Sequence, residues 1–149
     1  MKWLAFLAVL ILVQPAFAQG VTQPPPAQGA IGPATALTPA PDERAKQWLS
    51  LVDDGNYAEA YKQAGDVMHN GATADSFAKN VGDARAPLGA MASRNIKDIK
   101  MTKTLPGMRD GQYATVQFDS SFAHKAAAVE TVVLISDKGA WSVIGYHIS

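Results

Sequence analysis

Cysteine is absent from the 149-residue sequence, and its absence excludes several kinds of chemistry. The chain can form no disulfide, no thiolate metal site and no thiol nucleophile, and it offers no cysteine for the acylation of a bacterial lipoprotein. Packing alone must therefore hold the fold together.

An excess of either charge is also missing, since 13 lysines and arginines stand against 13 aspartates and glutamates. Nucleic acids and anionic lipids are both bound through clustered positive charge. We therefore expect no nucleic-acid partner.

Motifs for metals and cofactors are lacking as well. The histidines His69, His124 and His147 do not have the spacing of an HxH or HExxH metal site. The turn "PGMRDG" is not a phosphate-binding glycine pattern, and no GxSxG elbow occurs. We expect the protein to use no metal and no cofactor. A binding function is favoured over an enzymatic one.

A long apolar run occurs at the N-terminus, in "MKWLAFLAVLILVQPAFAQG". Lys2 precedes an apolar stretch from Trp3 to Val13, and the small-x-small "AFA" ends at Ala18, which is typical of a signal peptide. The stretch is shorter than the roughly 20 residues of a membrane-spanning helix. Residues 1–18 therefore predict export to the periplasm or the medium, with no stable span after processing; a retained anchor is the alternative.

Residues 19–41 read "QGVTQPPPAQGAIGPATALTPAP", rich in proline, glycine and alanine. Such a segment buries too little apolar surface to offset the entropy of ordering, which predicts a flexible spacer. A ligand for a proline-recognition domain is the alternative. The folded domain is expected over residues 42–149.

Helical periodicity fills the first half of that domain. Apolar residues recur at helical spacing over residues 42–55, 57–68 and 74–86. Gly55 is a stop signal, Asn56 and Thr73 are expected N-caps, and Pro87 ends the third pattern. Three helices are expected.

The second half has the alternation and turn residues of strands, over residues 93–105, 112–122, 127–136 and 140–148. Helices first and strands afterwards predict an α+β domain, with three N-terminal helices on one face of a four-stranded antiparallel meander. Because the strands are long, we expect the sheet to curve strongly into a cone with a pocket.

Four stretches, "WLSLVDDGNYAEAY", "RAPLGAMASR", "LPGMRDGQYATVQFDSSFAHK" and "ETVVLISDKGAWSVIGYHI", resemble those of the domain-of-unknown-function 4019 family and cover Trp48 to Ile148. The resemblance implies an exported bacterial protein with an architecture similar to the nuclear-transport-factor-2-like cone. That scaffold hosts isomerases, hydrolases and binding proteins, so it does not decide the function.

Glu130 interrupts the apolar strand "AVETVVLI". A buried carboxylate must be paired or hydrogen-bonded, and Arg85 and Arg94 are the expected partners. A structural ion pair is the favoured interpretation. A pocket carboxylate that acts as a base or anchors a ligand is one alternative, and exposure on a sheet edge is another.

Aromatic residues could line a pocket for an apolar ligand, although such stripes more often form the core. Tyr61 and Tyr146 stand out because a buried phenol can donate to a ligand oxyanion. The aromatic candidates are Trp48, Tyr57, Tyr61, Phe77, Trp141 and Tyr146.

Three functions remain. The favoured one is a non-catalytic exported domain that binds a protein partner, itself or a small apolar ligand, and dimerisation is expected to accompany it. The second is a pocket enzyme with Glu130 or Asp119 as base and a tyrosine or arginine as oxyanion donor. The third is a structural envelope protein that forms a homodimer through the open face of the sheet.

Overall fold

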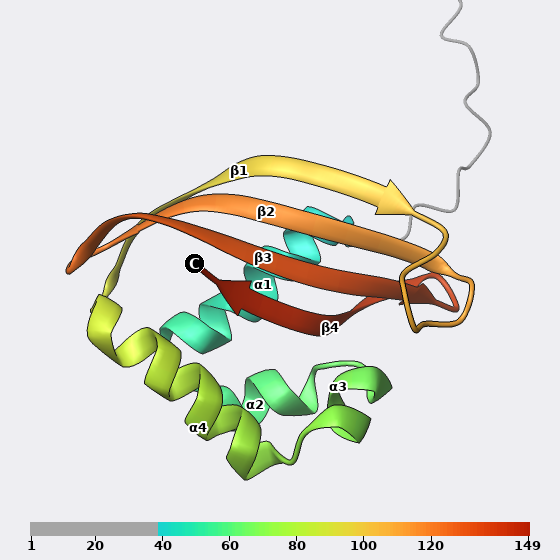
Figure 1. Ribbon diagram of the computed structural model, residues 1–149, viewed down its shortest axis with the longest axis horizontal. Coiled ribbons are helices and arrows are strands. Elements are labelled where there is room, and N and C mark those ends of the chain that lie inside the picture. Colours follow the sequence, from blue (N-terminus) through green and yellow to red (C-terminus); the bar gives the residue numbers. More distant parts are fainter. Residues whose placement is uncertain (1–38) are drawn as a thin grey trace, which may run out of the picture. The chain divides into compact units, whose positions relative to one another are not determined.

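A computed structural model describes residues 39–149, and there the helices precede the strands, which confirms the α+β class (Figure 1). The predicted signal peptide and nearly all of the predicted spacer lie outside the described residues. The elements are α1 Pro41–Asp53, α2 Tyr57–Lys62, α3 Asp66–Gly71, α4 Ala74–Arg85, the 3-10 turn η1 Ala86–Leu88, β1 Met91–Thr102, β2 Gln112–Phe122, β3 Lys125–Asp137 and β4 Ala140–Ile148.

Helix α1 forms as its sequence predicts. Its buried residues are Ala45, Trp48, Leu49 and Val52, which share the apolar face. Asp42 and Glu43 lie in the first turn, where carboxylates complement the helix dipole.

The single helix predicted over residues 57–68 is wrong, because the chain breaks there into α2 and α3. At the break, Ala64 forms a parallel bridge with Val143, and the Gly65 amide donates to the Val143 carbonyl at 2.7 Å. A Cβ at Gly65 would lie only 3.1 Å from Cγ2 of Ile144. The break therefore lets bare backbone reach the outer edge of β4, a tertiary contact that outweighs the local helical pattern.

Helix α4 is capped as predicted. The Thr73 side chain accepts from the Ser76 amide, and the Ser76 side chain accepts from the Thr73 amide, so two free amides at the helix start are satisfied. Phe77 and Val81 are buried, and the last residue, Arg85, is buried too.

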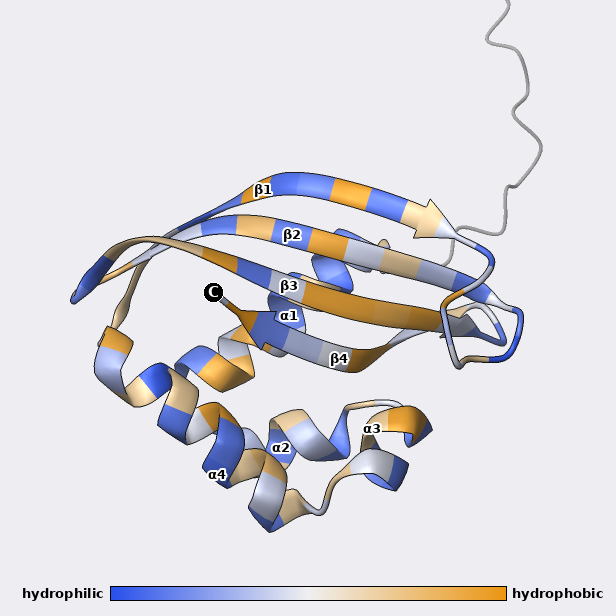
Figure 2. Ribbon diagram, viewed as in Figure 1, coloured by the Kyte–Doolittle hydropathy of each residue, from blue (hydrophilic) through white to orange (hydrophobic). Residues whose placement is uncertain are grey.

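The sheet is an antiparallel meander in the order β1-β2-β3-β4, with helices on one side of it (Figure 1). Register shifts occur in all three strand pairs, including one between Ile96 and Asp98 of β1. Colouring by hydropathy shows an apolar run along β3, whereas hydrophilic and apolar bands alternate along β1 (Figure 2). The central strands therefore carry the core, whereas β1 is a largely exposed edge strand.

The sheet is not strongly curled, so the predicted strongly curved cone is wrong. Large side chains fill the space between sheet and helices, among them Trp48, Phe118 and Leu134, all fully buried. This packed layer buries the apolar faces of both the sheet and the helices, so the sheet does not need to close around a cavity. Among residues 39–149, no helix combines the length and apolar character needed to cross a membrane.

Candidate functional site

Glu130 lies at the centre of a buried polar cluster, and its side chain is fully shielded from solvent. Each of the six longest elements, α1, α4 and the four strands, contributes one residue to it. We name this set the Glu130 cluster, and its members are Asp53, Arg85, Arg94, Ser120, Glu130 and Tyr146.

Both oxygens of Glu130 are saturated with donors. Oε1 accepts from Tyr146 Oη at 2.8 Å, Arg85 Nη1 at 2.9 Å and Arg94 Nη2 at 3.1 Å. Oε2 accepts from Ser120 Oγ at 2.6 Å and Arg94 Nε at 2.7 Å. The buried carboxylate is therefore fully paired, as the favoured interpretation of the sequence requires.

Asp53 is the second carboxylate, at the end of α1. Arg94 binds it through Nη1 at 2.7 Å to Oδ2 and Nη2 at 3.0 Å to Oδ1, and Arg85 Nη2 also donates to Oδ1. Each arginine thus bridges both carboxylates, and two positive charges balance two negative ones. Bidentate arginine pairing of this kind is short and strong.

The cluster shifts the ionisation of its own members. Burial of Tyr146, followed by the negative charge and hydrogen bond of Glu130, raises the pKa of the phenol. Burial by itself would lower the pKa of Arg94, but its bonds to Asp53 and Glu130 outweigh that effect and raise it. The pKa of Arg85 is raised for a similar reason. Burial would lower it, but the contacts with Tyr146, Asp53 and Glu130 outweigh burial. Both guanidinium groups stay charged and Tyr146 stays protonated.

Apolar neighbours enclose the cluster. The Arg85 guanidinium lies 4.6 Å from the centroid of the Phe122 ring, and the Trp48 ring packs edge-on against Tyr146 at 5.6 Å between centroids. Asp53 is the most exposed charged member, with 19% of its side chain accessible. The cluster has the closed, neutral form of a structural junction.

The other aromatic candidates do not join the cluster. Tyr61 donates to the Ala72 carbonyl at 2.8 Å and packs against His69 and Phe77. Trp141 is buried at the start of β4, and in the described part of the chain its indole nitrogen has no hydrogen-bond partner. Trp48, Phe77 and Trp141 are core residues, and Tyr57, Tyr61 and Tyr146 pack partly buried against that core.

Asp119, the other candidate base, lies on the far face of the sheet. It is 61% exposed and pairs with Lys97 at 3.0 Å. Of the histidines, His69 contacts the Tyr61 carbonyl through Nε2 at 2.7 Å, and His147 is exposed on β4. Residues 39–149 contain no group of three or more side chains that could hold a metal ion.

Sequence reasoning missed Asp53 and Ser120, although both left a signal. Asp53 ends a helix, where a negative charge opposes the helix dipole unless it has a partner. Ser120 takes the inward position between Phe118 and Phe122, where strand alternation predicts an apolar side chain.

Ser76 and Lys79 also have the S-x-x-K spacing of some serine enzymes. The Ser76 side chain is hydrogen-bonded to Thr73 in the capping box of α4, and Lys79 pairs with Asp83 on the exposed face of the same helix. The two residues therefore do not form a nucleophile and its base.

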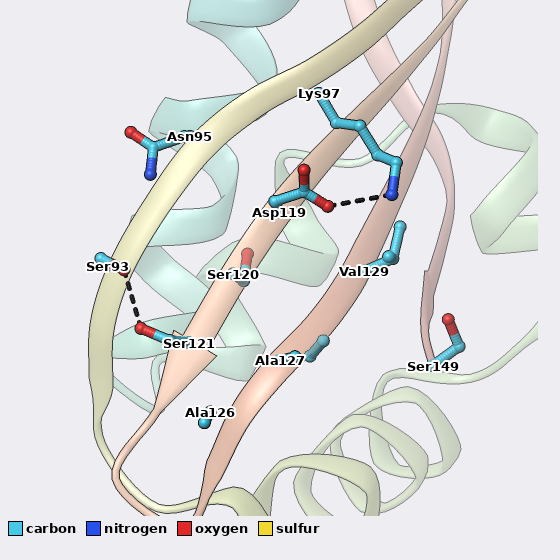
Figure 3. A pocket seen from close by; sticks show the side chains of 11 residues that line it. Ser93, Asn95, Lys97, Asp119, Ser120, Ser121, Ala126, Ala127, Val129 and Ser149 are labelled. Carbon is cyan, nitrogen blue, oxygen red and sulfur yellow. Dashed lines mark hydrogen bonds and ion pairs between the residues drawn. The ribbon is translucent and has the colours of Figure 1, made fainter.

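A hollow of about 450 Å³ lies on the outer face of β1, β2 and β3 (Figure 3). Ser93 and Ser121 join across it at 2.7 Å, and the Lys97–Asp119 pair forms one wall. Small side chains such as Ala127 leave it shallow. The Ser120 side chain turns away from it to reach Glu130, so the sheet separates this hollow from the cluster.

A smaller hollow of about 320 Å³ lies between α4 and β4. Tyr146 lines it together with Asn80, Val81, Ala84, His147 and Ile148. One cluster member therefore meets an open surface, through a ring whose hydroxyl is already bonded to Glu130.

Apolar side chains are exposed on β1, on the face that the helices cover elsewhere. Ile96 is 43% exposed, Ile99 39% and Met101 55%, and they lie opposite the buried residues Phe118, Val116 and Ala114. The helices therefore leave these three side chains partly uncovered. We name Ile96, Ile99 and Met101 the β1 apolar row.

Helices followed by an antiparallel meander, joined by a buried ion-pair cluster, define a small α+β domain. The family model described as "Protein of unknown function (DUF4019)" matches residues 44–146, and the chain belongs to this family. The match contains all six members of the Glu130 cluster and ends at Tyr146. No curated protein matches the sequence.

Proposed function

We propose that this protein is an exported, non-catalytic domain that binds a protein partner along β1. The observation that carries the proposal is the β1 apolar row, three large apolar side chains left 39–55% exposed on an edge strand of 12 residues. Exposed apolar groups gathered on one edge typically mark an interaction surface. An open strand edge adds backbone donors and acceptors for an extended partner.

The Glu130 cluster supports a structural role over catalysis. A general base must reach the proton of a substrate, but both Glu130 oxygens accept several protein donors and none of the residue is exposed. The pocket-enzyme alternative would require the arginines to release this carboxylate. Two arginines that each bind both carboxylates instead suit a clamp between helices and sheet.

The core argues against a small apolar ligand inside the domain. The aromatic candidates that could have lined a pocket pack against one another, as Trp48 does with Phe77 at 6.1 Å between centroids. Close packing of this kind leaves apolar binding to the surface. Among residues 39–149, three of the four exposed large apolar residues belong to the β1 apolar row.

Export is supported by the N-terminal sequence, and the mature N-terminus tests it. Expression of the complete sequence in a bacterial host and mass spectrometry of the product should give a chain that begins at Gln19. A product that keeps residues 1–18 would contradict the proposed cleavage.

Site-specific photocrosslinking in living cells tests the binding surface. A photoreactive amino acid at Met101 should capture a discrete protein, whereas the same group at Lys62 on α2, whose side chain is 79% exposed, should not. Adding Ile99→Lys should abolish the product, because a charge would then interrupt the apolar row. The absence of a product from Ile96, Ile99 and Met101 alike would overturn the proposal.

A further inference from the structure

The two edges of the sheet differ. Ala64 and Gly65 lie against β4 through the bridge to Val143 and the Gly65 amide bond. Strand β1 pairs with β2 on one side, and within residues 39–149 no strand pairs with its other side. An open edge of 12 residues is a template for another strand.

The register shift in β1 sets which side chains share a face. Ile96 lies opposite Phe118 and Ile99 opposite Val116, so both isoleucines face the helix side although an even-odd alternation would separate them. Lys97 is the extra residue of this bulge. Its pair with Asp119, and the position of Asp98 opposite Gln117, place Lys97 and Asp98 together on the outer face.

This order of faces is symmetric about the bond between Lys97 and Asp98. Counted outward from that bond in either direction, successive side chains lie on the outer face, the helix side, the outer face and the helix side. A second β1 strand, antiparallel and related by a two-fold axis through this point, would therefore match every position with one on the same face. A regular strand without the bulge would not match in this register, because neighbouring residues alternate faces.

The same axis also matches the chemistry. Ile96 lies opposite the partner's Ile99, and Lys97 lies opposite the partner's Asp98, each pair occurring twice. Shifting the axis onto Lys97 or onto Asp98 would place like charges opposite each other. We propose that the partner on β1 is a second copy of this chain, joined edge to edge about the bond between residues 97 and 98.

This inference rests on the proposed function and names the partner for the same surface. Pairing would join two four-stranded sheets and bring the two β1 apolar rows together on the helix side. The exposed Lys97 and Asp98, which would repel many other strands, are neutralised by their counterparts. Cross-strand charge pairs would then set the register.

Disulfide trapping tests the register, and the lack of native cysteine makes it clean. Two full-length chains are prepared, Ile96→Cys and a tagged Ile99→Cys, then mixed and oxidised. The mixed dimer should dominate, because residues 96 and 99 of different copies lie directly opposite, at about 4.5–5.5 Å between Cα atoms. Either chain alone should link several-fold less. Equal linkage in all three samples would overturn the proposed register.

Charge reversal tests the pairing by sedimentation equilibrium of the same full-length protein. Lys97→Glu and Asp98→Lys should each shift it from dimer to monomer, since each opposes like charges twice. The combined Lys97→Glu/Asp98→Lys variant should restore the dimer, and an unchanged circular-dichroism spectrum of each single variant checks that it folds. Lys62→Glu on α2 is the control and should leave the mass unchanged.

Each outcome separates the two proposals. A monomeric wild type whose Met101 position crosslinks to a different protein would overturn self-association and keep the binding surface. A dimer insensitive to both charge reversals would overturn the β1 interface. A monomer with no crosslinked product would overturn both proposals.

Discussion

At the scale of single residues, Glu130 is held by side chains from distant parts of the chain. An isolated carboxylate in an apolar strand demanded a cation, and both arginines named for that role bind Glu130. The contribution of Asp53 could not be inferred as readily, because its partners are 32 and 41 residues away and its only local signal is a charge that opposes the helix dipole.

Adjacent aspartates offer a matched test of that clamp. Asp53→Asn should lower the free energy of unfolding by about 1–3 kcal/mol, because two buried arginines lose one of their carboxylates. Asp54→Asn, the same change at the exposed neighbouring position, should stay within about 0.5 kcal/mol. Urea unfolding of the two variants beside the wild type measures the difference. Equal losses would show that Asp53 is not part of a stabilising cluster.

At the scale of elements, the patterns that depend on near neighbours predicted the structure well. Periodicity and turn residues correctly predict helices α1 and α4 and all four strands. They also predict the N-caps Asn56 and Thr73. The break between α2 and α3 could not be predicted in this way, because it depends on the approach of Gly65 to β4. The moderate curvature of the sheet likewise depends on how the core fills, which strand length alone does not determine.

Two glycines test why the chain breaks where it does. Gly65→Ala should destabilise the protein by about 1–3 kcal/mol, since the new Cβ would meet Ile144 at 3.1 Å and Ser142 at 3.2 Å. Gly71→Ala, at the end of α3 with no atom within 4 Å of the added Cβ, should be neutral or stabilising by up to about 1 kcal/mol. Thermal unfolding compares them, and a neutral Gly65→Ala would show that the contact with β4 can relax.

At the scale of the whole molecule, the cluster links stability to alkaline pH. The pKa of Tyr146 is raised, so the folded chain keeps its phenol proton at a pH where the unfolded chain has lost it. Above about pH 10 the unfolded state therefore binds fewer protons, and stability falls as pH rises through the folded pKa.

Tyr146→Phe should remove this part of the pH dependence. Between about pH 9 and about pH 11, the unfolding free energy of the Tyr146→Phe variant should fall less steeply with pH than that of the wild type. The two slopes should differ by at most about 1.4 kcal/mol per pH unit. Tyr61→Phe is the control, because its phenol bonds to a backbone carbonyl outside the cluster. Parallel pH profiles for Tyr146→Phe and the wild type would contradict a role for Tyr146 in this linkage.

The cluster draws one residue from each of the six longest elements, and this has a kinetic consequence. Any partly assembled chain that lacks one element holds a charge or hydroxyl without its partner, so the full set of bonds can close only when the last element arrives. Interactions that form after the rate-limiting step slow unfolding more than they speed folding. The cluster should therefore act mainly on the lifetime of the folded protein, a useful property for a chain that no disulfide holds closed.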